Sequence, residues 1–181
     1  MKVIPLTKGY AASVDDDDFG RLNAFKWCAL VIRRRDGSVL HVYAVRWVAI
    51  AGEKRILQYM HRFITDVTDP KTHVDHENHD GLNNQRHNLR IATPMQNHGN
   101  QLKQSFPASS KFKGVYWDKQ QRRWIAQLQT HGRSKKLGRF CSEEAAALAY
   151  DSAARELFGE FAQTNFLKDS PQNSMTSSIH K

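Results

Sequence analysis

The sequence has few of the features that mark a secreted or membrane protein. Its 181 residues include only two cysteines, Cys28 and Cys141, which lie far apart and form no Cys-x-x-Cys pair. This argues against a disulfide scaffold or a cysteine-based zinc site and suits a reducing compartment. No apolar run approaches the roughly 20 residues of a membrane span, and the first residues lack the apolar segment of a secretory signal. We therefore expect a cytoplasmic protein without membrane contact.

Acidic side chains are scarce relative to basic ones. Lys and Arg total 27 and Asp and Glu total 18, which gives a formal net charge of +9. The excess is spread along the chain, because residues 1–107 and residues 108–166 each carry +4. Such a balance favours a polyanionic partner, usually nucleic acid. Both halves of the chain are therefore expected to be able to face phosphates.

Residues 1–50 alternate short apolar runs with turn signals. Residues 33–37 separate two such runs and predict a hairpin turn, since Asp-Gly supplies the positive φ angles that tight hairpins need. The four consecutive aspartates at residues 15–18 precede spaced apolar side chains. We interpret them as a helix start, where carboxylates cap free amides and meet the positive end of the helix dipole. The alternative is a metal cluster, but contiguous residues cannot all point at one ion.

Residues 56–100 are dense in His, Asn and Asp and suit phosphodiester hydrolysis. That reaction needs a base that deprotonates water near neutral pH, and a cation that offsets charge on the scissile phosphate. His76 supplies an imidazole next to Asp75, a potential oxygen ligand for a hard cation. Adjacent residues of a strand point to opposite faces unless the strand end is distorted.

A second oxygen ligand is available in the helix that is predicted to begin at Thr93 and Pro94. These residue types are favoured at the cap and in the first turn, which places Asn97 just inside the helix. A strand, a turn at residues 80–81, a second strand at residues 88–92 and this short helix would bring Asp75 and Asn97 together around one ion.

This stretch resembles the HNH endonuclease motif, in the branch found in phage and intron-associated homing endonucleases. The pattern is a His-Arg pair, Asp-His, an Asn-rich turn, Asn-Leu-Arg and a final Asn. The resemblance implies a ββα-metal fold in which Asp75 and Asn97 ligate one Mg²⁺ or Mn²⁺ and His76 is the general base. It also implies that Asn88 holds the hairpin loop by side-chain hydrogen bonds.

The upstream pair, His61 and Arg62, fits the same motif and is expected to contact phosphate or to have a structural role. We count His61 and Asn88 with the catalytic residues and assign Arg62 and Arg90 to DNA contact. A structural zinc is an alternative for the remaining histidines of the region, but without cysteine ligands we favour surface or DNA-facing roles. These histidines are His73, His79, His87 and His98.

Residues 101–110 have linker composition, and a more regular region follows. Three strand-like runs at residues 112–117, 123–130 and 135–140 precede a helix with Ser142 as its N-cap. In the second run one face is buried and the other displays amides. On the helix, five residues recur at helical spacing and are predicted to pack on the sheet: Ala146, Ala149, Tyr150, Ala153 and Leu157.

Residues 110–166 resemble the APETALA2/ERF-type DNA-binding domain. The resemblance implies a three-stranded sheet that lies on DNA, with contacts from Lys113, Tyr116, Gln127, Gln129 and Lys136. Plant domains carry arginines at several of these positions, so their target sequence does not carry over. Trp117 and Trp124 are expected to pack in the core rather than stack on bases.

The expected fold class is α+β. A ββα-metal nuclease core spans residues 1–100, with a β-rich part at 1–55 and the motif at 56–100. A linker at 101–110, a small three-stranded antiparallel sheet packed on one helix at 111–166 and a flexible tail at 167–181 complete the chain. Each of these boundaries is an expectation drawn from composition and motif spacing.

The expected function is site-specific, homing-type cleavage of double-stranded DNA with Mg²⁺ or Mn²⁺. One active site per chain predicts a nick by a monomer, without a protein partner, in a phage-infected host cell or the bacterial cytoplasm. The alternative is a non-catalytic DNA-binding regulator whose nuclease half has decayed. An RNA-binding protein is a third option, but the sequence lacks the paired exposed aromatics of RNA-reading sheets.

Overall fold

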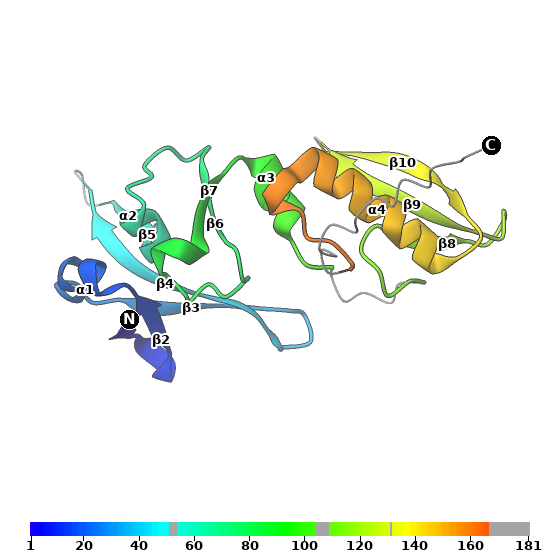
Figure 1. Ribbon diagram of the computed structural model, residues 1–181. Coiled ribbons are helices and arrows are strands. Elements are labelled where there is room, and N and C mark those ends of the chain that lie inside the picture. The colour runs from blue at the N-terminus through cyan, green and yellow to red at the C-terminus, as the bar shows by residue number, and fades with distance from the viewer. Residues whose placement is uncertain (51–53, 104–108, 131, 167–181) are drawn as a thin grey trace, which may run out of the picture. The chain divides into compact units, whose positions relative to one another are not determined.

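The computed structural model describes residues 1–50, 54–103, 109–130 and 132–166 and divides the chain into two compact units. The first unit is Met1–Gln101 and the second is Leu102–Lys181 (Figure 1). The expected tail at 167–181 and the middle of the expected linker lie outside the described residues. Among the described helices, none is long and apolar enough to cross a membrane.

The first unit begins with two small antiparallel sheets. Strands β1 (Lys2–Pro5) and β2 (Ala11–Val14) form one, with the 3-10 turn η1 (Thr7–Gly9) between them. Strands β3 (Cys28–Arg33), β4 (Val39–Ala49) and β5 (Arg55–Tyr59) form the other, in that order. The predicted hairpin turn is confirmed between β3 and β4, where Gly37 has a φ of 84°.

The aspartate run does begin a helix, α1 (Asp16–Asn23), but the predicted capping by its first carboxylate is wrong. Asp15 occupies the N-cap without a side-chain capping bond, because its carboxylate instead binds the later segment around Arg86. Buried side chains of this unit form one apolar cluster under α1 and the two sheets: Ile4, Ala12, Val14, Leu22, Trp27, Ala44, Met60 and Ile64.

The rest of the first unit has the order strand, loop, strand, helix. After α2 (Met60–Ile64), β6 (His73–His76) pairs antiparallel with β7 (Leu89–Ala92), and α3 (Pro94–Asn100) follows. The predicted cap of α3 is confirmed, since the Thr93 hydroxyl accepts from the Gln96 N–H while the Gln96 side chain binds back to the Thr93 N–H. Asn88 lies in the 3-10 turn η2 (Arg86–Asn88) rather than in the strand.

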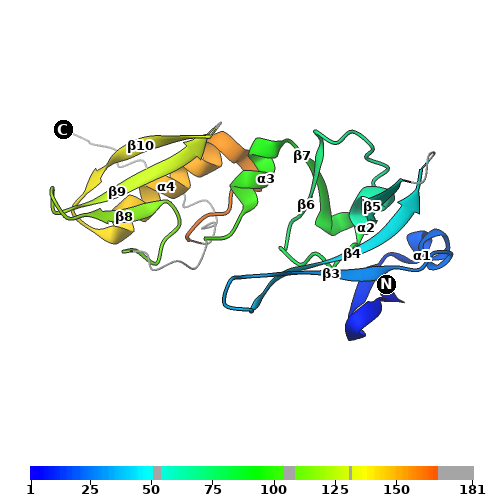
Figure 2. The same cartoon turned by 180° about the vertical axis from the view of Figure 1, so that it is seen from behind.

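The second unit is a three-stranded antiparallel sheet covered by one helix, as predicted. Its strands are β8 (Val115–Asp118), β9 (Arg123–Thr130) and β10 (Arg133–Phe140), with β9 in the centre. Helix α4 (Glu143–Phe158) lies along one face of this sheet, and the 3-10 turn η3 (Gly159–Phe161) follows it (Figures 1 and 2). Gly114 has a φ of 73°, and a Cβ there would collide with the Tyr150 ring of α4.

Candidate active site and DNA-contact residues

Asp75 and His76 lie at the end of β6, and both are buried, with 6% and 7% of their surface exposed. The two side chains have different neighbours. His76 contacts aromatic rings from two other elements: His61 of α2, whose ring centroid is 4.9 Å away at 88°, and Tyr43 of β4 at 6.0 Å. Asp75 instead meets β7 and α3. The strand end thus separates an imidazole pocket from a carboxylate site.

The Asp75 carboxylate is held by two partners. Arg90 of β7 donates from Nη2 to Asp75 Oδ2 at 2.6 Å. Asn100 of α3 donates from Nδ2 to the two carboxylate oxygens at 2.9 and 3.0 Å and to the His76 carbonyl at 3.2 Å. Sequence reasoning missed Asn100, although the three-residue spacing from Asn97 is a signal that both lie on one helix face.

The predicted second ligand, Asn97, lies one helical turn before Asn100 and is partly exposed. The structure therefore brings Asn100, rather than Asn97, into contact with Asp75. Among the described residues, no three His, Cys, Asp or Glu side chains gather as a metal-ligand set, so a zinc cluster of the nearby histidines has no support there. The carboxylate of Asp75 with amide oxygens of α3 is a donor set that fits a hard cation.

Burial controls the protonation of the histidine pair. It lowers the pKa of His76, although Asn84, Asp75 and Asp80 act to raise it. Burial, with the nearby His76 and Arg62, also lowers the pKa of His61 to about 3. Both imidazoles are therefore neutral near pH 7, which is the protonation state that a general base requires.

The loop between β6 and β7 is held by the Asn88 side chain. Its Oδ1 accepts from the Asn78 N–H at 3.0 Å, and its Nδ2 donates to the Asn83 carbonyl at 2.8 Å. These two bonds span the loop, so one side chain replaces the backbone pairing that a tight turn would provide. The loop-holding role that the family resemblance implies for Asn88 is present in the structure.

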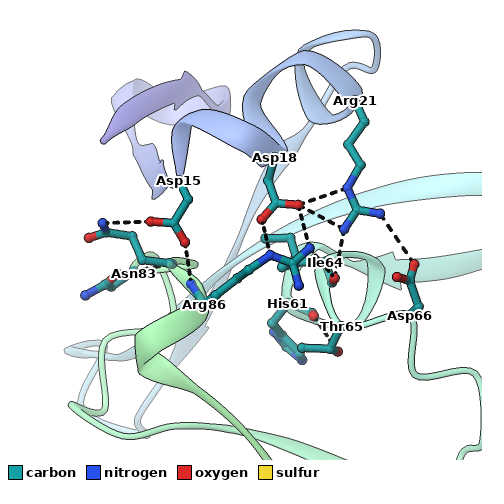
Figure 3. Close-up of polar contacts among 10 residues, drawn as sticks. Asp15, Asp18, Arg21, His61, Ile64, Thr65, Asp66, Asn83 and Arg86 are labelled. Atoms are coloured by element: carbon teal, nitrogen blue, oxygen red, sulfur yellow. Dashed lines mark hydrogen bonds and ion pairs between the residues drawn. The ribbon is translucent and has the colours of Figure 1, made fainter.

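The end of the same loop is tied to α1 by an ion-pair network centred on the buried carboxylate of Asp18 (Figure 3). Asp18 is only 2% exposed and accepts two bonds from Arg86, from Nε and Nη2, each at 2.8 Å. Arg21 donates to the same carboxylate at 3.0 Å and to the Ile64 carbonyl at 2.8 Å. The Asp15 carboxylate accepts from the Arg86 N–H at 2.7 Å, which lowers the pKa of Asp15. Two of the four aspartates thus position the loop between β6 and β7.

The two arginines assigned to DNA contact in this unit make bonds within it. Arg62 donates to the Thr72 carbonyl and the Asp69 carbonyl, each at 2.7 Å, and so fixes the segment after α2. Arg90 holds Asp75 and lies 3.4 Å from Glu77. The structure gives both guanidinium groups a structural role, and their contact with DNA stays a prediction.

In the second unit, four of the predicted contact residues share one face of the sheet. Gln127 pairs with Lys136 across β9 and β10, and Tyr116 pairs with Ile125 of β9. Gln127 and Gln129 alternate with Ala126 and Leu128, which are buried on the α4 side. Tyr116, Gln127, Gln129 and Lys136 therefore lie on the face that α4 does not cover.

Lys113 departs from this arrangement. It precedes β8, and its Nζ lies 6.0 Å from the ring centroid of Tyr150 on α4. Burial lowers the pKa of Lys113 to about 8, with Asp151 acting to raise it. The ammonium group thus lies toward the helix rather than on the exposed sheet face, because Gly114 brings the backbone against Tyr150. Trp117 and Trp124 pack edge to face at 5.0 Å, and Trp124 joins the core, which supports a packing role.

Comparison with known proteins agrees with both halves of this description. Residues 110–160 match the family model of the AP2 domain. The chain is 39% identical over 167 residues to an uncharacterized HNH endonuclease of Acanthamoeba polyphaga mimivirus. The aligned region covers 82% of this chain and 86% of the relative. No solved structure matches. The chain therefore belongs to the HNH endonuclease family, and an AP2 DNA-binding domain follows its nuclease unit. We call Met1–Gln101 the HNH unit and Leu102–Lys181 the AP2 unit.

Proposed function

We propose that the protein cleaves double-stranded DNA at a recognised site, with His76 as the general base and one divalent metal ion. The observation that carries the proposal is the pairing of a buried, neutral imidazole with a carboxylate at one strand end. The AP2 unit supports DNA as the substrate, because its exposed sheet face displays amide and basic side chains.

The residues around Asp75 and His76 have different parts in this reaction. His76 takes a proton from the attacking water, and its neutral state near pH 7 allows this. Mg²⁺ or Mn²⁺ held by Asp75 and Asn97 would neutralise charge on the scissile phosphate. Asn100 and Arg90 fix the orientation of Asp75, and His61 packs against the edge of the His76 ring. His61 therefore limits the rotation of the base.

The AP2 unit sets where the enzyme cuts. Its net charge attracts phosphates without regard to sequence, and its exposed glutamines can bond base edges in the major groove. Because each chain has one proposed active site, in the HNH unit, a monomer makes a single-strand nick. A homing-type nickase of this design needs no protein partner.

One observation favours the non-catalytic alternative. The ion pair of Arg90 with Asp75 at 2.6 Å engages a carboxylate oxygen that a metal would need. A protein in which this pair persisted on DNA would bind its site without cutting it.

The experiment that decides between the two functions is cleavage of a random-sequence plasmid library by the full chain. With Mg²⁺ or Mn²⁺ present, we expect nicks, and sequencing of their ends should show one shared sequence. Protection of a shared sequence without new ends, in either metal, would favour the DNA-binding alternative.

A further inference from the structure

Asn84 has no assigned role, although it lies fully buried beside the candidate base. It belongs to the loop between β6 and β7, and none of its surface is exposed. Its backbone N–H donates to the Ser13 carbonyl of β2 at 2.8 Å, and its side-chain Nδ2 donates to the Gly81 carbonyl at 3.4 Å. Gly81 in turn is seated so closely on β4 that a Cβ would collide with the Tyr43 ring. The amide of Asn84 is therefore fixed in place.

Each of these two side chains, His76 and Asn84, has one polar atom that is buried without a hydrogen bond among the described residues. The atoms are Nε2 of His76 and Oδ1 of Asn84. The Asn84 side chain also acts on His76 as a hydrogen-bonding group and favours its protonated form. Buried polar atoms without partners are rare because their desolvation is not repaid. The simplest resolution is that these two atoms are partners of each other.

The orientation of the amide decides which atom faces the imidazole. Since Nδ2 donates to the Gly81 carbonyl, Oδ1 is the atom left for His76. The opposite orientation would set Oδ1 against a carbonyl oxygen, which is repulsive. An Oδ1 that faces Nε2 can only accept, so Nε2 must carry the proton.

We propose that Asn84 is the positioning residue for His76: its Oδ1 accepts from Nε2–H and leaves the Nδ1 lone pair to take the proton from water. In proteins the bond made by one ring nitrogen sets the tautomer of the other. The catalytic consequence rests on the proposed nuclease function, whereas the tautomer is a property of the protein alone. The amide of Asn84 thereby links His76 to β2, through the Ser13 carbonyl, and to β4, on which Gly81 is packed.

The tautomer is measured on the metal-free full chain by long-range ¹H–¹⁵N correlation of histidine rings at pH 7.5. The His76→Gln variant identifies the His76 signals. We expect the pattern of a proton on Nε2. A proton on Nδ1 would overturn the proposal, whether or not the protein cleaves DNA.

Kinetics of nicking give the second readout, with Asn84→Leu and Asn84→Asp compared. Leu removes the acceptor, so we expect a fall in kcat of about 10-fold or more with KM within twofold. Asp keeps an acceptor for Nε2–H and should recover most of the rate. Asn83→Ala is the matched control, because the side chain of Asn83 bonds only the nearby Gln85 N–H among the described contacts. It should stay within threefold of the wild type.

Thermal unfolding is measured for every variant so that folding and orientation are told apart. A folded Asn84→Leu variant that nicks within twofold of the wild type would contradict the proposal. Equal losses in folded Asn84→Leu and Asn84→Asp variants would do the same, because only the first lacks the acceptor. Should Asn84→Leu fail to fold, the wild-type tautomer alone decides.

Discussion

The HNH unit and the AP2 unit hold their candidate functional residues in different ways. In the HNH unit the site depends on single polar contacts, such as Asn88 across its loop and Asp18 with Arg86. In the AP2 unit the predicted DNA-contact face depends on an antiparallel ladder with one register shift in β10, backed by small apolar residues of α4. A site built from single contacts is expected to lose function steeply when one is removed. A face built on a ladder should instead change in graded steps.

Metal removal should give the largest effect on the HNH unit. Excess EDTA should abolish nicking, and added Mg²⁺ or Mn²⁺ should restore it, because Asp75 and the α3 amides are oxygen donors for a hard cation. The measurement is the fraction of nicked plasmid before and after metal is added back. Undiminished nicking in chelator would remove the metal from the mechanism. Protection of the target site in EDTA would show that DNA binding does not require the metal.

Loss of the base should be nearly as severe. His76→Ala should slow nicking about 10²-fold or more, which is the size typical of losing a general base. Binding to the target should stay within twofold of the wild type. The control is His98→Ala on the exposed surface of α3, which should leave the rate unchanged. A His76→Ala rate within twofold of the wild type would reject the assignment.

Removing the buried carboxylate under the loop should destabilise the whole HNH unit. Asp18→Ala leaves Arg21 and Arg86 without their shared partner, at an expected loss of about 3 kcal/mol of unfolding free energy. Asp16→Ala is the matched control, because Asp16 is exposed and pairs only with the amino terminus among the described contacts, so we expect about 0.5 kcal/mol or less. Urea unfolding of both variants tests the difference, and equal losses would mean that the network does not anchor the loop.

The stability of the HNH unit should fall as the pH falls. His61 has an unfolded pKa of 6.5 and a folded pKa of about 3, so below pH 6.5 the unfolded chain binds a proton that the folded chain excludes. Unfolding is therefore favoured by about 1.4 kcal/mol for each pH unit below 6.5, and the stability is regained as the pH rises through 6.5. The burial of His76 acts in the same direction. Urea midpoints between pH 5 and pH 7 measure the slope, and an unchanged slope in His61→Gln would contradict this origin.

The same contrast explains how much could be predicted from the sequence. In the AP2 unit, alternation along β9 and the Ser142 cap predict the sheet and the helix, because each signal is local. The buried face of α4 was only partly predicted. Ala146 and Tyr150 are buried and Ala149 packs against the core, as expected. Ala153 and Leu157 are only half-buried, however, whereas Ala147, Ala154 and Phe158 are buried. A run of alanines carries too little hydrophobic contrast to indicate its face.

In the HNH unit, the motif residues could be recognised one at a time, but their supports could not. Asp18 and Arg86 are 68 residues apart, and Asn100 lies 25 residues after Asp75. No periodicity links such pairs, because they depend on how separate elements pack. The aspartate run was interpreted through its own helix, which is the nearest partner that sequence can offer. Asp18, the buried aspartate of the run, binds Arg86 in the loop between β6 and β7, which lies close to α1 only in the folded chain.

The smallest expected effect concerns the AP2 unit, where the loss of one side chain should change the sequence preference only in part. Gln127 lies in the centre of β9, on the sheet face that α4 leaves open, and its Oε1 accepts from the Ser134 hydroxyl at 3.0 Å. That bond orients the amide and leaves its Nε2 group to donate to a base edge. Gln127→Ala should therefore relax the preference at one base position by about 1–3 kcal/mol, while nicking at the remaining positions of the site stays selective.

Lys113 supplies the matched comparison for Gln127. Because its ammonium group lies over Tyr150, Lys113→Met should alter the thermal stability of the AP2 unit and leave the sequence preference unchanged. Both variants are measured by sequencing nick positions on one library, with the salt dependence of binding as a second readout. A shift in base preference for Lys113→Met would place its side chain on the DNA face. The DNA contact would then come from the loop before β8 rather than from the open face of the sheet.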